Sequence, residues 1–388
     1  MRRPVPSSTG CVDRRTFLRS GAGFVATAGL CGAACGRATG IGPGVALVRQ
    51  ASYDPAGVQA SLARAVALLG GIDALVRNKN VTVKVNLTGY AEAMFGRAPG
   101  ESYVTHPATA LALATLLKDL GANRVRFVES CPTRETFERF AATFGWSCAQ
   151  LAALGNVDFE NTRNLGSASS YATRAVPGSP RLFSHFLLNR AYVDTDVLVS
   201  LAKMKNHVTA GVTLAMKNLF GITPNALYGT EAGSLGENAT AYRGCLHNRA
   251  DGGVASLPGE LAGFETRDAF FRVPRIVTDL VAARPIDLAI VDGITTVSGG
   301  EGPWNQGSAS MSFLSPGVLV VGRDAVATDA VSVRVMGYAD PLAPRGTPPF
   351  AFCDNHILLA AEAGLGVGDV ARIDVRGESI GDVVTRFA

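Results

Sequence analysis

The sequence IDLAIVD at residues 286–292 decides the fold class, because it is a nearly continuous apolar run. Strands of a parallel sheet are covered by helices on both faces, so they lose the polar alternation of a strand with one wet face. A helical pattern precedes this run at 276–283, and a further strand and helix follow at 318–321 and 325–336. Strand and helix therefore alternate, which predicts crossover connections between parallel strands.

The same alternation extends towards the N-terminus. Asp54 followed by Pro55 is typical of a helix start, with a capping carboxylate and proline in the first turn. Thr105-His106-Pro107 predicts another helix start, and Gly121 ends that helix. The further predicted elements are strands at 45–49, 81–86, 125–129 and 196–200 and a helix at 211–219.

Two stretches interrupt the alternation, at 161–190 and, more strongly, at 222–270, where Gly, Ser, Asn and Ala are frequent. An irregular stretch of this length is typical of a lid, a binding insertion or a segment that orders on binding. The sequence therefore predicts an α/β fold with a mostly parallel sheet flanked by helices and a long irregular insertion at about 222–270. We expect a single large domain over 45–388.

Composition excludes several classes of protein. With 47% hydrophobic and 18% charged residues among 388, the chain can bury a sizeable core, and disorder is not its main state. Residues 1–35 hold five of the 36 basic and one of the 32 acidic residues, so the remainder is formally neutral. A neutral body has no basic patch of the kind that binds DNA or RNA, and no nucleic-acid partner is expected.

The N-terminus has the sequence pattern of a targeting signal. The sequence DRRTFL at 13–18 places Arg14 and Arg15 before two apolar residues, and an uncharged Gly- and Ala-rich stretch follows at 20–36. This pattern resembles a twin-arginine (Tat) signal, so we predict a signal peptide at 1–35, export by the Tat machinery and a periplasmic or extracytoplasmic location. The alternative is a disordered basic tail.

The sequence leaves two alternatives for the residue at which this signal ends. Gly32-Ala33-Ala34-Cys35 is a degenerate lipobox, with Gly32 where leucine is usual, and would make Cys35 a lipid anchor. Ala26-Thr27-Ala28 has the small-x-small form of ordinary cleavage. Beyond the signal, the cysteines lie far apart, so no iron-sulfur cluster is expected, whereas one or two disulfides fit an oxidising compartment. These cysteines are Cys131, Cys148, Cys245 and Cys353.

The densest polar pattern is KMKNH at 203–207, which follows the predicted strand at 196–200. Ligands of open α/β sheets bind at the carboxyl ends of strands. If the strand continues, Lys203, Lys205 and His207 share one face and would recognise an anion. The structural alternative is that one lysine snorkels, the other is solvated and His207 caps a turn. Lys217 and Asn218 in an apolar segment weaken that alternative, because a buried ammonium needs a partner.

A resemblance to a known family follows from these residues. The string KMKNHVTAGVTLAMKNLFGI at 203–222 occurs with VKVNL at 83–87, THP at 105–107, VES at 128–130, IVDGI at 290–294 and EGP at 301–303. In order and spacing, the set resembles the family catalogued as Domain of Unknown Function 362, over roughly 81–335. The resemblance implies an α/β fold and assigns no reaction. Some relatives carry ferredoxin-like cysteines, and their absence here argues against a redox role.

Further candidates lie at strand ends. Lys84 and Asn86 are two residues apart and so point the same way on a strand, while Glu129 and Asp292 each end an apolar run. Glu301 is the one acid of a glycine-rich loop at 299–303. Any one of these acids alone more often caps a helix or forms a turn. Asp324 is interpreted as such an N-cap.

These patterns favour an exported enzyme that acts on a small anionic substrate, a carboxylate or phosphoryl compound. The predicted substrate-binding residues are Lys84, Asn86, Lys203, Lys217 and Asn218. The predicted catalytic residues are His207, Lys205 and Glu129, and Asp292 and Glu301 are predicted to bind a divalent metal, Mg, Mn or Ca. The alternative is a non-catalytic periplasmic ligand-binding or assembly factor that uses the same lysines.

Overall fold

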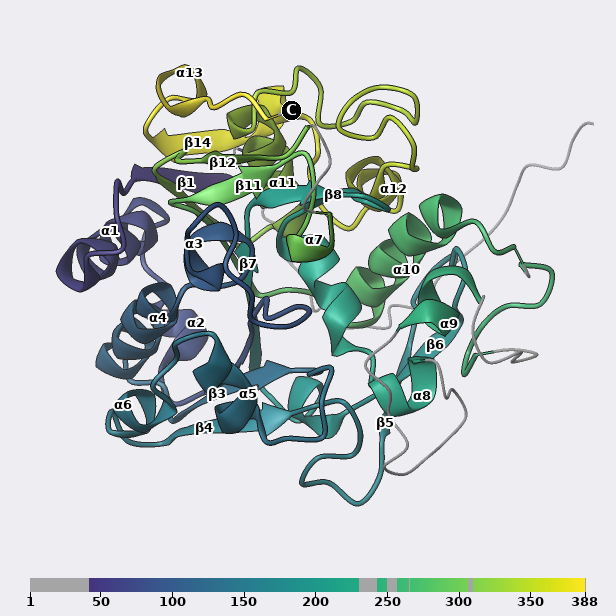
Figure 1. The fold of residues 1–388 in the computed structure, drawn as a ribbon, viewed down its shortest axis with the longest axis horizontal. Coiled ribbons are helices and arrows are strands. Elements are labelled where there is room, and N and C mark those ends of the chain that lie inside the picture. Colours follow the sequence, from purple (N-terminus) through teal and green to yellow (C-terminus); the bar gives the residue numbers. More distant parts are fainter. Residues whose placement is uncertain (1–41, 230–242, 250–256, 265, 306–309, 388) are drawn as a thin grey trace, which may run out of the picture. The chain divides into compact units, whose positions relative to one another are not determined.

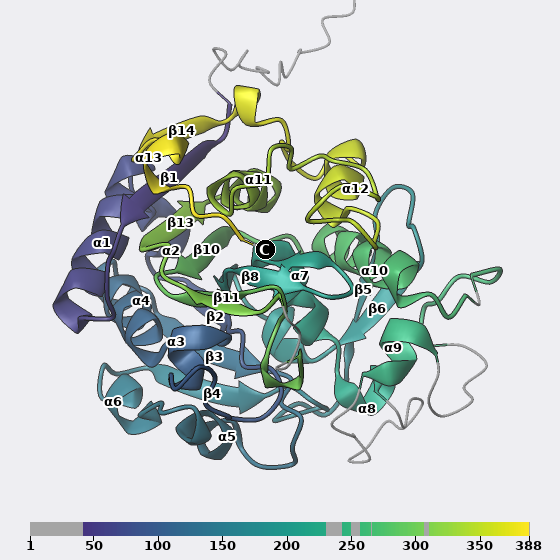
Figure 2. The ribbon, with the colours of Figure 1, turned by 45° about the horizontal axis from the view of Figure 1, so that its top comes forward.

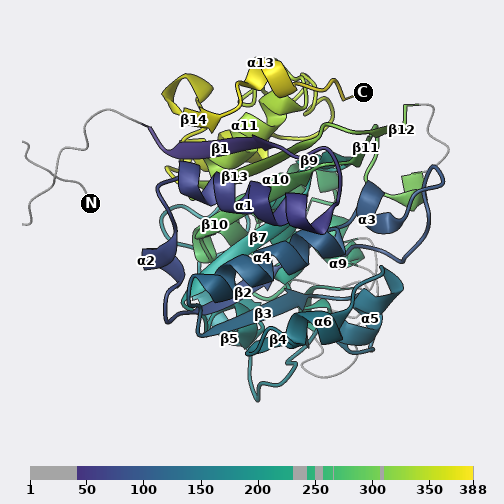
Figure 3. The same ribbon diagram turned by 90° about the vertical axis from the view of Figure 1, so that its left-hand side faces the viewer.

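Eight strands form the central sheet of the chain, whose computed structural model describes residues 42–229, 243–249, 257–264, 266–305 and 310–387. β13 is antiparallel to both its neighbours, whereas the other adjacent pairs are parallel. The predicted α/β class with a mostly parallel sheet is thereby confirmed. In spatial order the strands are β14 (Asp374–Gly377), β1 (Gly44–Arg49), β13 (Val318–Gly322), β10 (Leu288–Gly293), β7 (Val197–Lys203), β2 (Asn80–Lys84), β3 (Arg124–Glu129) and β4 (Val157–Asn161). Figure 1 shows β14 and β1 on one side of the sheet and β3 and β4 on the other, and Figure 3 labels the strands in this order.

The strand sequences contribute to two hydrophobic cores, one on each face of the sheet. Along β13, Val318 and Val320 pack into one core, while Leu319 and Val321 pack into the other, as the two-residue period of a strand requires. The helices that bring buried residues to the second core are α1 (Pro55–Leu68), α2 (Asp73–Val76), α4 (Pro107–Asp119), α5 (Phe137–Thr143) and α6 (Cys148–Ala152). Figure 3 shows α1 and α4 side by side on this face.

The opposite face carries the elements that position the candidate site. They are α7 (Ala215–Asn218), α10 (Ala269–Ala283), α11 (Ala325–Val335) and α12 (His356–Glu362), together with α8 (Asn225–Tyr228) and α9 (Gly244–Asn248). Figure 2 places the hairpin of β5 (Ala172–Ala175) and β6 (His185–Leu188) beside α8 and α9. The contact includes a bond from the Leu187 N–H to the Tyr228 hydroxyl at 2.9 Å.

The predicted helix starts are confirmed by their hydrogen bonds. Asp54 Oδ2 accepts from the Gly57 N–H at 2.8 Å, and Asp324 Oδ1 accepts from the Ala327 N–H at 2.9 Å. At the start of α4 the capping residue is His106, whose Nδ1 lies 3.0 Å from the Ala108 nitrogen. These caps satisfy N–H groups that have no partner within the first helical turn.

Two local expectations are corrected. Residues 211–219 are not one helix: β9 (Gly211–Thr213) pairs with β8 (Lys205–His207), and only then does the short α7 begin. Gly211 has φ +76° and leaves no room for a Cβ against Phe350, which suits a hairpin turn and not a helix. α10 starts at Ala269 instead of 276 and includes Pro274, which has no N–H to donate to the Phe270 carbonyl. The Asp354 N–H donates to that carbonyl instead.

The remaining elements are short. They are α3 (Pro99–Ser102), β11 (Thr296–Ser298), β12 (Ser312–Leu314), α13 (Ile380–Val383) and the 3-10 helices Arg190–Tyr192, Leu219–Ile222, Pro303–Asn305 and Val370–Arg372. Within the described ranges, no helix has the length and apolarity needed to cross a bilayer. Cys131, Cys148 and Cys353 carry buried free thiols. The predicted Tat signal and Cys35 lie outside the described residues.

Candidate functional site

Several of the predicted residues meet at one edge of the sheet. β2, β3, β7 and β10 are neighbouring parallel strands, so their carboxyl ends lie together. Lys84, Glu129 and Lys203 are the last residues of their strands, and Asp292 is the last but one of β10. All four side chains are buried. The lysines and acids form separate pairs there, which are described in turn.

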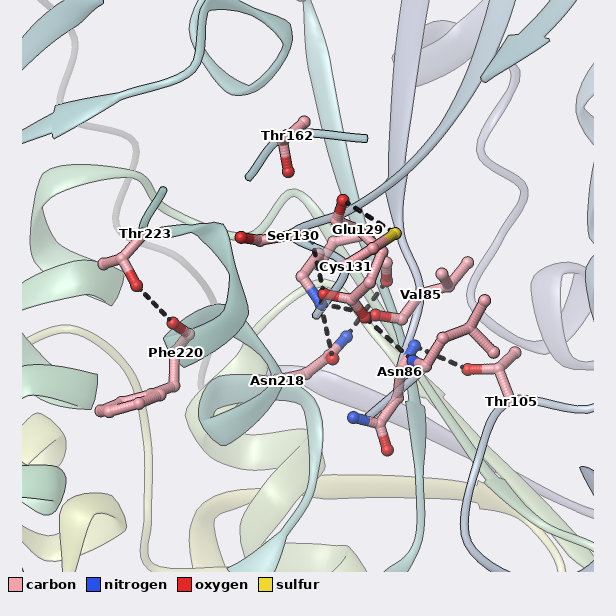
Figure 4. Close-up of polar contacts among 12 residues, drawn as sticks. Val85, Asn86, Thr105, Glu129, Ser130, Cys131, Thr162, Asn218, Phe220 and Thr223 are labelled. Carbon is pink, nitrogen blue, oxygen red and sulfur yellow. Dashed lines mark hydrogen bonds and ion pairs between the residues drawn. The ribbon is translucent and has the colours of Figure 1, made fainter. Parts of the chain in front are cut away.

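The first pair joins Lys84 to Glu129. Figure 4 shows Glu129 with Asn218 nearby. Lys84 Nζ lies 2.7 Å from Glu129 Oε1, and the two side chains are 1% and 5% exposed. Asn218 completes the group, since its Oδ1 is 3.3 Å from Lys84 Nζ and its Nδ2 donates to the Ser200 hydroxyl at 3.1 Å. Burial lowers the pKa of Lys84, although Glu129 opposes this shift. The two charges are therefore stabilised by their direct contact and not by solvent.

A buried aspartate that sequence reasoning did not assign to the site holds Asn218 in place. Asp329, on α11, accepts hydrogen bonds from the Ala215 and Met216 N–H groups at 2.8 and 2.9 Å, and so caps α7. Burial raises the pKa of Asp329 to about 7, because the two N–H groups only partly oppose it. The available signal was an acid within the otherwise apolar helical pattern at 325–336. Capping of a neighbouring short helix explains that acid.

The second pair joins Lys203 to Asp292 on the face of α4. Lys203 Nζ donates to the Tyr53 hydroxyl at 2.6 Å and to the Gly100 carbonyl at 2.8 Å, and lies 3.7 Å from Asp292 Oδ2. Asp292 also accepts from the hydroxyls of Tyr53 and Thr109 at 2.8 and 3.1 Å. Burial lowers the pKa of Lys203 to about 8. Two hydrogen bonds and an ion pair engage this ammonium, so the group is an internal cross-link.

The third group contains Lys205, His207 and Glu301. Lys205 Nζ donates to the carbonyls of Tyr103 and Glu301 at 2.8 and 2.7 Å, while His207 Nδ1 lies 2.9 Å from Glu301 Oε2. Trp304 Nε1 donates to Glu301 Oε1 at 3.0 Å. Burial lowers the pKa of His207 to about 4 and that of Lys205 to about 7. Burial opposes ionisation of Glu301, but His207 and the lysines outweigh it and hold the Glu301 pKa well below its usual range.

The strand that carries Lys203 does not continue to Lys205 and His207, which is the condition on which their predicted shared face depended. β7 ends at Lys203, the Met204 N–H donates to the Asp292 carbonyl at 2.9 Å, and β8 begins at Lys205 in a different sheet. Lys203 Nζ donates to the Gly100 carbonyl and Lys205 Nζ to the Tyr103 carbonyl, so both lysines contact the segment around α3. β8 pairs with β9 in a two-stranded sheet instead of extending the central sheet.

Lys217 differs from the other lysines. Its side chain is only 7% exposed, and Nζ lies 4.4 Å from the centre of the Phe220 ring. In the described part of the chain, no acceptor forms a hydrogen bond or ion pair with it. Burial lowers its pKa to about 8, and the carboxylates of Glu301 and Glu129 both oppose this shift. Lys217 therefore lies between the Lys84 and Lys205 groups with an ammonium left for a further partner.

Arg243, at the start of α9, is a cation that sequence reasoning missed. Its Nη1 donates to the carbonyl and hydroxyl of Thr223, whereas the buried Nη2 has no hydrogen-bond partner among the described residues. Burial lowers the pKa of Arg243 to about 10, and Glu129 supplies the largest opposing charge. No local pattern could have selected it, because the insertion at 222–270 has no periodicity. Asn86 likewise leaves its buried Oδ1 unpaired, while its backbone bonds to Thr105.

Comparison with protein families now adds to this geometry. The model of the family described as "Domain of unknown function (DUF362)" matches residues 81–334. The chain belongs to the DUF362 family. All ten residues predicted from the sequence lie within the matched range, as does Arg243, whereas Tyr53 lies outside it. The predicted resemblance is thereby confirmed, and the family description assigns no reaction.

Two known proteins are similar to parts of this DUF362 chain. A thylakoid-associated protein of Synechocystis sp. is 26% identical over 261 residues, which cover 62% of this chain and 75% of that protein. A Thermotoga maritima protein of known crystal structure is 15% identical with a TM-score of 0.37, over 64% of this chain. The chain spans about half the length of that structure, 52%.

The charges of the DUF362 site do not balance. The buried cations around the carboxylates of Glu129 and Glu301 are Lys84, Lys205, Lys217 and Arg243. With His207 neutral at pH 7, cations outnumber carboxylates among the described residues of these two groups. A buried excess of positive charge is unfavourable unless an anion compensates it.

Asp292 and Glu301, the predicted metal ligands, contact different groups of residues. Asp292 belongs to the Lys203 group and Glu301 to the His207 group, and the side-chain oxygens of both accept hydrogen bonds. Across the described ranges, no group of three or more His, Cys, Asp and Glu side chains is arranged to hold a metal ion. Two surface cavities, of about 230 and 510 Å³, are lined by none of the ten predicted residues.

Proposed function

We propose that this DUF362 protein binds a small anion, a carboxylate or a phosphoryl compound, between the Lys84 and Lys205 groups. The observation that carries the proposal is the ammonium of Lys217, which has no hydrogen-bond or ion-pair acceptor in the described part of the chain although the residue is only 7% exposed. Leaving such a group unpaired costs several kcal/mol, roughly what a bound anion would recover. Arg243 Nη2 and the excess of cations support the same site.

The arrangement around His207 supports proton transfer. His207 Nδ1 lies 2.9 Å from Glu301 Oε2 and 3.2 Å from the Thr209 nitrogen, so both neighbours hold the imidazole in place. A pKa of about 4 leaves His207 unprotonated at pH 7, as a proton acceptor must be. The pKa of Lys205, about 7, lies close to that pH. Glu129 accepts from Lys84 and from two backbone N–H groups, so it orients that lysine. We therefore favour an enzyme, with His207 as the proton acceptor.

A second candidate is a ligand-binding or assembly factor without catalysis. It is supported by the engagement of Glu129 and Asp292, which leaves few acids free for chemistry. His207→Gln separates the two candidates once a reaction is found. Loss of turnover with unchanged anion binding favours the enzyme, and unchanged turnover would remove His207 from the chemistry.

The anion site is tested by thermal stabilisation. Phosphate, sulfate and acetate should raise the melting temperature more than chloride at matched ionic strength, because an anion that binds only the folded chain stabilises it. Lys217→Met keeps the apolar stem and should abolish the difference. Lys79→Met removes an exposed lysine and should leave it unchanged. If Lys217→Met responds to anions as the parent does, the anion binds elsewhere.

We also propose that the protein is exported through the Tat machinery, with the location beyond the cytoplasmic membrane that this implies. Arg14 and Arg15 before two apolar residues support the proposal. Replacing both arginines with lysine should retain the precursor in the cytoplasm, as measured by cell fractionation. Continued export of the double-lysine variant would refute it. A mass measurement on the exported protein decides between a lipid on Cys35 and cleavage after Ala28.

A further inference from the structure

Among the described residues, three buried polar atoms near the Lys84 pair have no hydrogen-bond partner. They are Ser130 Oγ, Asn225 Oδ1 and Arg243 Nη2. Ser130 and Asn225 are only 6% and 1% exposed, so bulk water does not satisfy them. Leaving a buried polar atom unpaired costs about 1–3 kcal/mol, which makes three such atoms in one region unusual.

These three residues are far apart in the sequence, but their contacts place them in one neighbourhood. Asn225 Nδ2 donates to the carbonyl of Cys131, the residue after Ser130, at 3.2 Å. Arg243 Nη1 donates to the carbonyl of Thr223, two residues before Asn225, at 2.5 Å. Figure 4 shows the Ser130 hydroxyl pointing away from Glu129, with no interaction drawn to it.

The unpaired atoms differ in what they require. Arg243 Nη2 can only donate, so it needs an acceptor such as an anionic oxygen. The bond from Asn225 Nδ2 to Cys131 fixes the orientation of the amide, so its unpaired Oδ1 can only accept and needs a donor. Ser130 Oγ can serve either role. A simple anion such as acetate or sulfate offers acceptors and no donor.

We propose that the ligand is a hydroxylated anion, a hydroxy acid or a sugar phosphate. Its anionic group faces Lys217 and Arg243, and its hydroxyl donates to Asn225 Oδ1 with Ser130 as a second partner. This inference rests on the proposed anion site and adds the class of compound that occupies it. A hydroxyl that completes a buried acceptor should strengthen binding about threefold to tenfold.

Matched pairs of probes test the inference. Glycolate is compared with acetate, and glycerol 3-phosphate with propyl phosphate, by calorimetry and thermal shift on the full chain at one pH and ionic strength. The hydroxylated member of each pair should bind more tightly to the parent. Ser130→Ala and Asn225→Leu should reduce that preference and retain the response to acetate. Ser332→Ala, which removes a buried serine bonded within α11, should keep the preference.

The outcomes separate the two proposals. No response of the parent to any of the four anions would overturn the anion site itself. Equal binding within each pair would overturn the hydroxyl inference and leave the anion site standing. If Asn225→Leu does not fold, Ser130→Ala still decides, because a preference that survives in it as in Ser332→Ala would remove the hydroxyl from this neighbourhood.

Discussion

The buried ion pair between Lys84 and Glu129 can be tested by removing its cation. Lys84→Met keeps the length and apolar stem of the side chain but deletes the ammonium, which contacts Glu129 Oε1 at 2.7 Å. Glu129 is 4% exposed, so its carboxylate would remain in the interior without its direct ion-pair partner. In the unfolded chain, the Glu129 carboxylate is solvated whether residue 84 is Lys or Met. The substitution therefore acts mainly on the folded state.

The magnitude follows from the contacts that survive. Removing one partner of a buried pair costs about 3–5 kcal/mol. Glu129 keeps the N–H groups of Leu87 and Ser130 at 2.9 and 3.0 Å, so we expect the lower end, about 3 kcal/mol. For the unit Ile41–Ala388, the unfolding entropy is about 0.7 kcal/mol/K, which converts this loss into a fall of about 4 °C in Tm.

The assay is urea unfolding at pH 7, followed by fluorescence of the buried Trp146. The matched control is Arg139→Met, which breaks a pair with Glu135 at 3.1 Å whose side chains are 76% and 53% exposed. An exposed pair of this kind is worth at most about 1 kcal/mol. A free energy of unfolding for Lys84→Met that falls no further than that of Arg139→Met would refute the reasoning.

Two further predictions concern pH and metal. Lys203, Lys205 and Lys217 have folded pKa values of about 8, 7 and 8, below that of an unfolded lysine, so the folded chain binds fewer protons and the free energy of unfolding should rise between about pH 7 and 10. Lys205→Met should reduce that rise, as measured by urea titrations. Anion affinity should fall as the pH rises through about 8, because Lys217 then loses its charge. Exhaustive chelation should leave anion stabilisation unchanged, because the oxygens of Asp292 and Glu301 already accept bonds. Loss on chelation, with recovery in Mg²⁺, Mn²⁺ or Ca²⁺ that Asp292→Asn weakens, would instead support the predicted metal site.

The strand and helix order could be predicted from the sequence because the signals are local. Apolar runs, periodic leucines and caps such as Asp54 and Asp324 act within a few residues. The edge strands β4 and β14 were missed, since their sequences VDFEN and DVRG are short and polar. Residues at strand ends could also be predicted, because parallel neighbours share one edge, which places Lys84, Glu129 and Lys203 together.

The sequence by itself determined the α/β class, the family and the residue types at the sheet edge. The tertiary structure alone decided which lysine meets which acid: Lys84 pairs with Glu129, Lys203 is cross-linked to Asp292, and Lys217 is left unpaired among the described residues. The physical reason is distance along the chain. A pairing between remote strands depends on the break after Lys203 and on the packing of α7 and α9, and no pattern of neighbouring residues encodes either.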